Sequence, residues 1–368
     1  MKVLVLSVST GQGHHATGKA IVKYIEEKGH QAKMVDAYRY INPALSESIS
    51  KSYLMSTKYT PTVYGTFYRL AEKCDMTEKK VSLSRMANHI MSKAFASCIT
   101  EYEPDVIVCT HVMAVQLLDA MREHDLDSRI KTVGIITDFT IHPYWEDTYL
   151  DYYITASELL NNQIRKKKIP LEKVRPFGIP IDEKFAQKIT KQEAREKLGI
   201  ADKDTVLVMS GSMGYGNVIK HIRALDKLDM DFQMLIVCGN NKSLKKRMEE
   251  LVTEKQVKIY GFVDNVDVMM DAADCIVTKP GGLSVSESLA KGLPMILMNP
   301  IPGQEDRNLE FLLNNGLGQF ITETYPVDEA VFQLYHNSWR QENMSGEIRS
   351  FGKPYATRDL CEFILGLS

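Results

Sequence analysis

The chain has 368 residues, a formal net charge of -2 at pH 7, and 44% hydrophobic residues. At roughly 150 residues per domain, this length predicts two domains with separate cores. A charge so near zero gives no general attraction to nucleic acid, so any charged partner must be met by a local patch.

The cysteines and the length of the apolar segments predict the cellular compartment of the protein. The six cysteines are scattered without a C-x-x-C pair, which is typical of reduced thiols in a cytoplasmic protein. No apolar stretch approaches the roughly 18 residues that a membrane span needs, and the first residues enter a strand rather than a leader. We therefore expect a cytoplasmic protein whose contact with a membrane is peripheral, at the cytoplasmic face.

The first strand runs into "STGQGHHATGKA", residues 9–20, which fits three patterns. A G-x-G-x-x-A fingerprint for a dinucleotide starts at Gly11, and Asp36 stands where a ribose-binding acid is expected. A P-loop pattern starts at Gly13, but its last position is Ala20 instead of Ser or Thr. In the third interpretation, a tight turn after the strand presents His14 as a general base. This segment alone leaves the three open.

Short apolar, β-branched runs alternate with Gly-containing turns and amphipathic stretches, which predicts βαβ units and parallel sheets. The predicted strands lie within 2–8, 31–38, 105–111, 132–138, 152–157, 204–211, 232–239, 257–263, 274–281 and 293–299. This pattern predicts an α/β fold of two doubly wound, Rossmann-like domains, 1–180 and 181–350. The join is expected near "VRPFGIPIDEKF", before a helix that starts near Lys191. Residues 351–368 are expected to form a helix that packs back on the first domain.

One segment interrupts this alternation, an insertion over about residues 38–98. Residues 38–93 carry nine Lys or Arg and four Asp or Glu, with tyrosines such as Tyr59 and Tyr64 interleaved. Mixed basic and aromatic residues suit the headgroup region of an anionic bilayer. The alternative is a helical insertion whose Tyr and Met residues form a small core of their own. The sequence favours neither.

The segment "TKPGGLSVSESLAKGLPMIL", residues 278–297, predicts a site for an anion. After a strand, Gly281 and Gly282 make a tight turn, and a helix is expected to begin near Ser284 with Glu287 in its first turn. Backbone N–H groups at such a helix start can bind a diphosphate, and Glu287 can accept hydrogen bonds from ribose hydroxyls. Alternatively, Glu287 complements the helix dipole in a capping-box-like arrangement with Ser284.

Three more loops complete this site. Gln304 and Glu305 stand side by side after the next predicted strand, and an amide beside a carboxylate suits the adjacent hydroxyls of a hexose. Phe262 is expected to cover a flat base while the main chain at Val263 pairs with its edge, although a core position for Phe262 is the alternative. The Gly-rich turn 209–216 is expected to admit phosphate near the backbone, at the two residues Gly211 and Ser212.

These motifs together resemble a known family. The pairing of "STGQGHHATG" with "PGGLSVSESLAKGLPMIL" and "IPGQEDRN" is similar to the diacylglycerol glycosyltransferases of glycosyltransferase family 28. That group contains the plant monogalactosyldiacylglycerol synthases and the bacterial processive diacylglycerol glucosyltransferases. The similarity extends over nearly the whole chain, including "EPDVIVCTH" and "TDFTIHPYW". The G-G-x-S-x-x-E element alone is shared with the enzyme that adds N-acetylglucosamine to the peptidoglycan lipid precursor.

The resemblance implies a GT-B fold, with a UDP-sugar held by the second domain and a lipid acceptor by the first. It implies an inverting, peripheral membrane enzyme of glycolipid biosynthesis that needs no metal. It places the base at His14, the ribose on Glu287, and the sugar on Gln304 and Glu305. The diphosphate is expected near Ser212, Gly281 and Gly282.

In the first domain, Asp138 is the second candidate for the base, because it ends a predicted strand at the same edge as His14. His142 and Trp145 are expected to shape the lipid site, with Trp145 at the bilayer interface. Their alternative roles are a turn acid, a capping histidine and a packed indole. The full set expected at the acceptor or the membrane is Gly13, His111, His142, Trp145, Tyr59 and Tyr64.

Other functions remain open from the sequence. A peptidoglycan-precursor type of transferase or a UDP-sugar epimerase would share the GT-B fold. A nicotinamide oxidoreductase would use the opening turn and Asp36 but would leave residues 278–308 without a role. A sensor that binds UDP without transfer is disfavoured, because the chain has the full set of His14, Glu287, Gln304 and Glu305. The residues do not distinguish glucose from galactose as the donor sugar.

Overall fold

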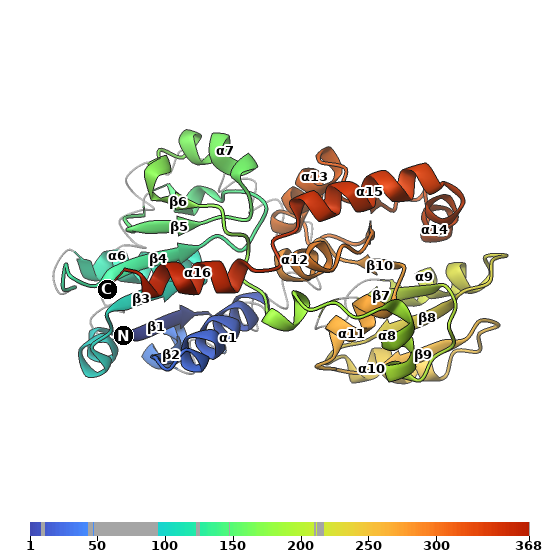
Figure 1. Ribbon diagram of the computed structural model, residues 1–368, viewed down its shortest axis with the longest axis horizontal. Helices are drawn as coiled ribbons and strands as arrows, with labels where there is room; N and C mark the ends of the chain where they lie inside the picture. The colour runs from blue at the N-terminus through green and yellow to red at the C-terminus, as the bar shows by residue number, and fades with distance from the viewer. Residues whose placement is uncertain are drawn as a thin grey trace. The chain divides into compact units, whose positions relative to one another are not determined.

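The computed structural model describes residues 1–8, 12–42, 47, 95–122, 126–146, 148–209, 211 and 217–367. The chain forms two compact units (Figure 1). The first contains Met1–Glu183, Ile301–Gln304 and Tyr355–Ser368, and the second contains Lys184–Pro300 and Glu305–Pro354. The boundaries expected from the sequence, after residues 180 and 350, lie close to these divisions.

The first unit is built on a parallel sheet with strand order β2-β1-β3-β4-β5-β6. The strands are β1 (Lys2–Ser7), β2 (Gln31–Asp36), β3 (Val106–Cys109), β4 (Lys131–Ile135), β5 (Tyr152–Ile154) and β6 (Val174–Arg175). The helices include α1 (Gln12–Glu27), α2 (Ala37–Ile41), α6 (Val112–Arg122), α7 (Asn161–Lys166) and α16 (Ala356–Leu365). β3 is buried along its whole length, as expected of a parallel strand covered on both faces.

The second unit repeats this architecture with strand order β12-β11-β10-β7-β8-β9. The strands are β7 (Thr205–Met209), β8 (Gln233–Val237), β9 (Val257–Tyr260), β10 (Cys275–Thr278), β11 (Met295–Leu297) and β12 (Gln319–Phe320). The helices are α8 (Lys191–Leu198), α9 (Val218–Asp226), α10 (Lys242–Glu249), α11 (Val266–Ala272), α12 (Gly282–Lys291), α13 (Gln304–Asn314), α14 (Val327–His336) and α15 (Ser338–Phe351).

The ten predicted strands are all present, and the expected fold class is confirmed. β6 and β12, which have two residues each, were not predicted. α8 begins at Lys191 as expected, because Thr190 caps it in a capping box with Glu193. Of the insertion at 38–98, the structure describes residues 38–42, 47 and 95–98. Tyr59 and Tyr64 lie outside the described residues.

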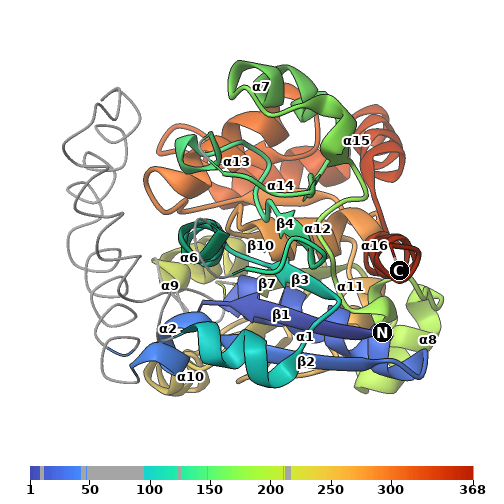
Figure 2. The same ribbon diagram turned by 90° about the vertical axis from the view of Figure 1, so that its left-hand side faces the viewer.

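Each sheet reverses its strand order at one point, where ligands of such folds bind outside the carboxyl ends of the strands. In the first sheet this point lies between β1 and β3, which are neighbours (Figure 2). In the second sheet it lies between β7 and β10. α1 follows β1, and α12 follows β10, so His14 and Gly281 each lie beside a reversal point.

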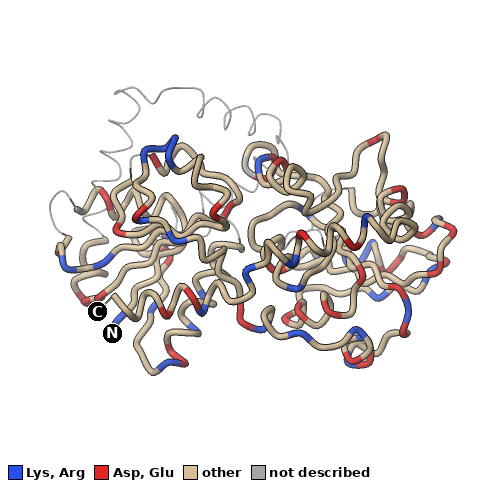
Figure 3. Tube along the Cα trace, turned by 45° about the horizontal axis from the view of Figure 1, so that its top comes forward, with Lys and Arg blue, Asp and Glu red and all other residues tan. Residues whose placement is uncertain are grey.

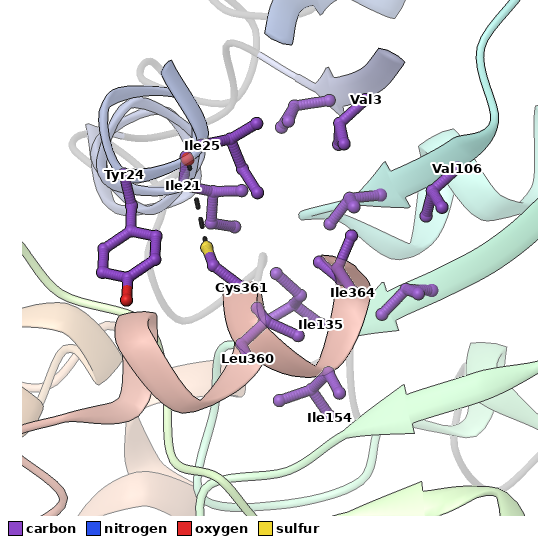
Figure 4. Packing of buried hydrophobic residues seen from close by; sticks show 13 residues of the cluster. Val3, Ile21, Tyr24, Ile25, Val106, Ile135, Ile154, Leu360, Cys361 and Ile364 are labelled. Atoms are coloured by element: carbon purple, nitrogen blue, oxygen red, sulfur yellow. Dashed lines mark hydrogen bonds between the residues drawn. The ribbon is translucent and has the colours of Figure 1, made fainter. Parts of the chain in front are cut away.

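The core of the first unit includes α16, although more than 300 residues separate it from α1. Leu360, Cys361 and Ile364 are fully buried against Ile21 and Ile25 of α1 and against the central strands (Figure 4). The Cys361 thiol lies 4.0 Å from the carbonyl oxygen of Ile21. α16 is therefore an integral part of the first unit.

No helix in the described part of the chain is both long enough and apolar enough to cross a membrane.

Candidate active site

The first group of candidate residues centres on His14, in the first turn of α1. The Nδ1 atom of His14 lies 2.8 Å from the carbonyl oxygen of Thr110 and 3.0 Å from the hydroxyl oxygen of Thr137. A carbonyl oxygen can only accept a hydrogen bond, so Nδ1 carries the proton and donates it to Thr110. The other ring nitrogen, Nε2, then holds a lone pair. This is the tautomer that a general base requires.

The surroundings of His14 favour its neutral form. Burial lowers its pKa below the ordinary value of 6.5, while the Asp138 carboxylate and the hydrogen bond to Thr110 act in the opposite direction. A histidine with a lowered pKa stays unprotonated through the neutral pH range. His14 is therefore able to accept a proton where a free imidazole would be partly charged, and Asp138 can stabilise the imidazolium that forms.

Two more histidines from the predicted acceptor set lie at the same edge of the sheet. The rings of His14 and His111 meet edge to face with their centroids 4.5 Å apart. His111 Nδ1 accepts the Met113 N–H at 3.1 Å, and His142 Nδ1 accepts the Tyr144 N–H at 3.1 Å. Both rings therefore carry their proton on Nε2 when neutral. Burial lowers the pKa of His111 well below its usual value, and the neighbouring His14 and His142 add to this effect.

Trp145 is not at a bilayer interface in this structure. The residue is 4% exposed, and its ring packs against Tyr153 with the centroids 6.3 Å apart. Gly134 makes this possible, because a Cβ at that position would lie 2.9 Å from the indole. The expected interfacial position of Trp145 is therefore wrong, and the alternative of a packed indole is correct. His142 likewise has its alternative role, as the cap of a short 3-10 helix, Pro143–Trp145.

The geometry of α1 excludes the P-loop interpretation. α1 begins at Gln12, so Gly18 and Lys19 lie inside the helix instead of at its start. A Cβ on Gly18 would lie 2.7 Å from the sulfur of Met34, so this glycine lets α1 approach the sheet closely. Gly13 is half-buried in the first turn of α1. Asp36, the ribose candidate, accepts the Arg39 N–H at 2.8 Å and caps α2.

In the second unit, α12 begins earlier than the sequence predicted. Its first residue is Gly282 and its N-cap is Gly281, which leaves no side chain to bond the first N–H groups. Ser284 is therefore inside the first turn, and Glu287 is in the second turn. The start lies two residues before Ser284, near the expected position, whereas the first-turn position of Glu287 and its capping-box alternative are wrong. An uncapped helix start favours an anion more than a capped one does.

Lys279 and Glu305 lie beside this helix start. A Cβ on Gly281 would lie 3.6 Å from Glu305 Oε1, so the carboxylate lies close to the N-cap. Burial lowers the pKa of Lys279, and the Glu305 carboxylate opposes that shift. Lys279 was not predicted as a site residue, although a lysine between a buried strand and a Pro-Gly-Gly turn is a signal for a phosphate site. Gln304 is the first residue of α13, and its side chain lies outside the described part.

The remaining donor-site candidates lie on loops of the second unit. Phe262 is 69% exposed, so the core alternative for this residue is wrong and its ring is available to a ligand. Val263 is half-buried beside it. Gly211 has a φ of +73° after β7, and no atom lies within 4 Å of a Cβ placed on it. Ser212 lies outside the described residues.

Comparison with known proteins finds two matching family models and several relatives of similar length. A model described as monogalactosyldiacylglycerol (MGDG) synthase matches residues 14–181, and one described as glycosyl transferases group 1 matches residues 190–319. The chain is 28% identical to the processive diacylglycerol beta-glucosyltransferase of Bacillus pumilus, over 99% of this chain and 94% of that protein. Over nearly its whole length, the chain is therefore similar to the diacylglycerol glycosyltransferases of family 28.

Solved structures show that the chain has the expected GT-B fold. MurG of Acinetobacter baumannii is similar with a TM-score of 0.63 and 14% identity, over 99% of both chains. The UDP-GlcNAc 2-epimerase of Neisseria meningitidis is similar with a TM-score of 0.60 and 14% identity, over all of both chains. A transferase and an epimerase thus share the fold, so the choice between these activities depends on the site residues.

Proposed function

We propose that the protein is an inverting glycosyltransferase that moves a hexose from a UDP-sugar to diacylglycerol or a related glycolipid at the cytoplasmic membrane surface. The observation that carries the proposal is the His14 tautomer, with Nδ1–H donated to Thr110 and Nε2 left as a proton acceptor. The names of the curated relatives support diacylglycerol as the acceptor. Structural neighbours solved with UDP or UDP-glucose support a UDP-sugar donor.

In the proposed reaction, the hydroxyl oxygen of the acceptor attacks the anomeric carbon of the donor from the face opposite UDP. His14 Nε2 takes the hydroxyl proton as the new C–O bond forms. The bond between the anomeric carbon and the diphosphate breaks, and its electron pair leaves with UDP. The configuration at the anomeric carbon is inverted because one displacement occurs.

The leaving group needs positive charge near its diphosphate. The uncapped start of α12 supplies partial positive charge from backbone N–H groups, and Lys279 supplies a full charge beside it. Glu287, one turn further along α12, is proposed to bind the ribose, and Phe262 the uracil. Gln304 and Glu305 are proposed to hold the sugar hydroxyls. With these groups in place, we propose that transfer needs no metal ion.

The proposal is tested by incubating the protein with UDP-glucose or UDP-galactose and vesicles that contain diacylglycerol and an anionic phospholipid. Lipid products are then resolved by mass spectrometry. We expect a monohexosyl lipid with one of the donors, and its anomeric configuration should be opposite to that of the donor. Absence of a glycolipid with every UDP-sugar would overturn the proposal. Conversion of a UDP-sugar to its epimer without lipid would establish the epimerase alternative.

A further inference from the structure

The outer surface around α7 carries an unusual group of free cations. Residues 165–168 are all basic, and three of them are exposed, Arg165, Lys166 and Lys168. In the region that the structure describes, none of the three forms an ion pair. Lys167 differs, because it lies 3.1 Å from Glu146. Figure 3 shows basic residues gathered on this part of the first unit.

Two large apolar side chains are exposed on segments that adjoin α7 in the chain or in the fold. Leu159 is 55% exposed and lies in the 3-10 helix Glu158–Leu160, directly before α7. Tyr149 is 68% exposed and precedes Leu150, whose carbonyl oxygen accepts a hydrogen bond from Lys173 of the next 3-10 helix, Leu171–Lys173. We call Tyr149, Leu159, Arg165, Lys166 and Lys168 the α7 surface. Cations beside an exposed Leu and Tyr are the composition of a bilayer-facing surface.

The inner side of α7 is bonded to the loop of the candidate active site. Gln163 Oε1 accepts hydrogen bonds from the Thr140 hydroxyl and from the Ile141 N–H, both at 3.1 Å. These two residues lie between Asp138 and His142 in the sequence. A membrane on the outer side of α7 would therefore be separated by this helix from the loop that contains Asp138 and His142. This position suits an enzyme whose acceptor stays in the bilayer.

A structural role explains only part of this pattern. Cations in the last turn of a helix complement its dipole, which accounts for Arg165 and Lys166 in α7. It does not account for Lys168 beyond the helix or for the exposed Leu159. Burying these apolar side chains in an interface would be favourable, and three unpaired cations would be attracted to an anionic leaflet.

We propose that the α7 surface docks on the anionic headgroups of a bilayer, with Leu159 and Tyr149 in the headgroup region. The inference rests on the proposed function, because only a lipid acceptor gives the surface its purpose. It assigns membrane contact to residues other than the basic insertion at 38–98. Phosphatidylglycerol is the probe of choice, since it presents a phosphate with one negative charge.

The test measures sedimentation with vesicles of phosphatidylcholine, with and without about one third phosphatidylglycerol. The variant R165Q/K166Q/K168Q should bind the anionic vesicles on the order of 10- to 100-fold more weakly than the wild type, as expected for the loss of three cations at a charged surface. The matched control, K227Q/K242Q/R247Q, removes three exposed, unpaired cations of the second unit and should bind like the wild type. L159S should weaken binding further.

Equal binding of the α7 variant and the wild type would overturn the docking proposal, as would equal losses in the α7 variant and the control. A transfer assay with a short-chain, water-soluble diacylglycerol separates the two proposals. The α7 variant should transfer sugar to this acceptor at the wild-type rate. If the wild type transfers no sugar although its binding depends on the α7 surface, the proposed function fails and the docking surface stands.

Discussion

The Thr110 carbonyl decides which nitrogen of His14 can act as a base. The hydrogen bond joins residues 96 positions apart, so no local pattern predicts it. The sequence selected His14 over its neighbour only through the family resemblance. The structure adds a physical reason, which is the tautomer. Burial lowers the pKa of His15 as it does that of His14, and Lys19 acts in the same direction. Of these two histidines, however, only His14 has its tautomer fixed by a carbonyl oxygen of the described residues, that of Thr110.

Replacement of His14 should abolish most of the transfer without affecting donor binding. In H14A, kcat should fall by about 10²- to 10⁴-fold, the usual contribution of a general base. UDP affinity, measured by calorimetry, should remain within about twofold, because the groups proposed to bind UDP itself, such as Glu287 and Lys279, belong to the second unit. H15A is the matched control and should retain activity. The reverse result, an inactive H15A with an active H14A, would make His15 the base.

The pH profile should separate the two candidate bases, His14 and Asp138. Because burial lowers the pKa of His14, the rate should be constant at neutral pH and should fall only below pH 6.5, as the imidazole becomes protonated. Asp138 raises the pKa of His14, so D138N should move this acid limb of kcat/KM to lower pH. If D138N instead removes activity at every pH while H14A retains it, Asp138 is the base.

Lys279 should act on the leaving group. In K279Q, kcat should fall by about 10- to 100-fold, because the diphosphate loses one fixed positive charge. K258Q on β9 is the control variant. K291Q is unsuitable, because Lys291 forms a buried ion pair with Asp271.

The proposed transfer needs no metal ion, so an excess of a chelator should leave the wild-type rate unchanged. A wild-type rate that requires added Mg²⁺ would contradict the proposed metal-free transfer.

The start of α12 shows a conflict between helix stability and ligand binding. The usual capping rules favour Ser284 as the N-cap, whereas the structure uses Gly281. Gly281 has φ -77° and ψ 137°, a conformation that any residue adopts, so the glycine is not required by the backbone. What it provides is an open approach to the first N–H groups. Departures from local sequence rules of this kind are common at binding sites.

An aspartate at the N-cap of α12 should therefore impair donor binding without a large loss of stability. In G281D the carboxylate can accept hydrogen bonds from the free N–H groups, a gain of about 1 kcal/mol that repulsion from the nearby Glu305 carboxylate should offset in part. The same carboxylate should repel the diphosphate and weaken UDP binding by at least tenfold. Thermal unfolding and calorimetry measure the two effects, and G281A is the control for added volume. A G281D variant that binds UDP like the wild type would exclude the α12 start as the diphosphate site.

The long parallel strands could be predicted from sequence because strands covered on both faces read as unbroken apolar runs. β6 and β12 could not be predicted, because a strand of two residues is too short to show a hydrophobic pattern. In the site, the sequence predicted most of the residues that can do chemistry, but it did not predict their burial or their hydrogen-bond partners. Trp145 is buried because Gly134, on β4, leaves room for its ring. The contact between Gly134 and Trp145 depends on tertiary packing and cannot be predicted from a local sequence pattern.

The packing of α16 on α1 should control the stability of the first unit. L360A removes a fully buried side chain and should cost about 2 to 5 kcal/mol. Because a chain with two units need not unfold in one step, hydrogen exchange at the amides of α1 is the appropriate measurement. Exchange there should accelerate strongly in L360A and remain unchanged in L313A, where the leucine is 40% exposed. Equal exchange in both variants would show that α16 is not part of this core.

The contact between Cys361 and Ile21 also has a consequence for the protein while it is still on the ribosome. The two residues are 340 positions apart, so α1 is complete long before α16 is translated. At roughly 5 to 20 residues per second, the apolar groove for α16 stays uncovered for about 20 to 70 seconds. A nascent chain with Ile21 and Ile25 exposed for this long is a target for the chaperones that bind emerging polypeptides.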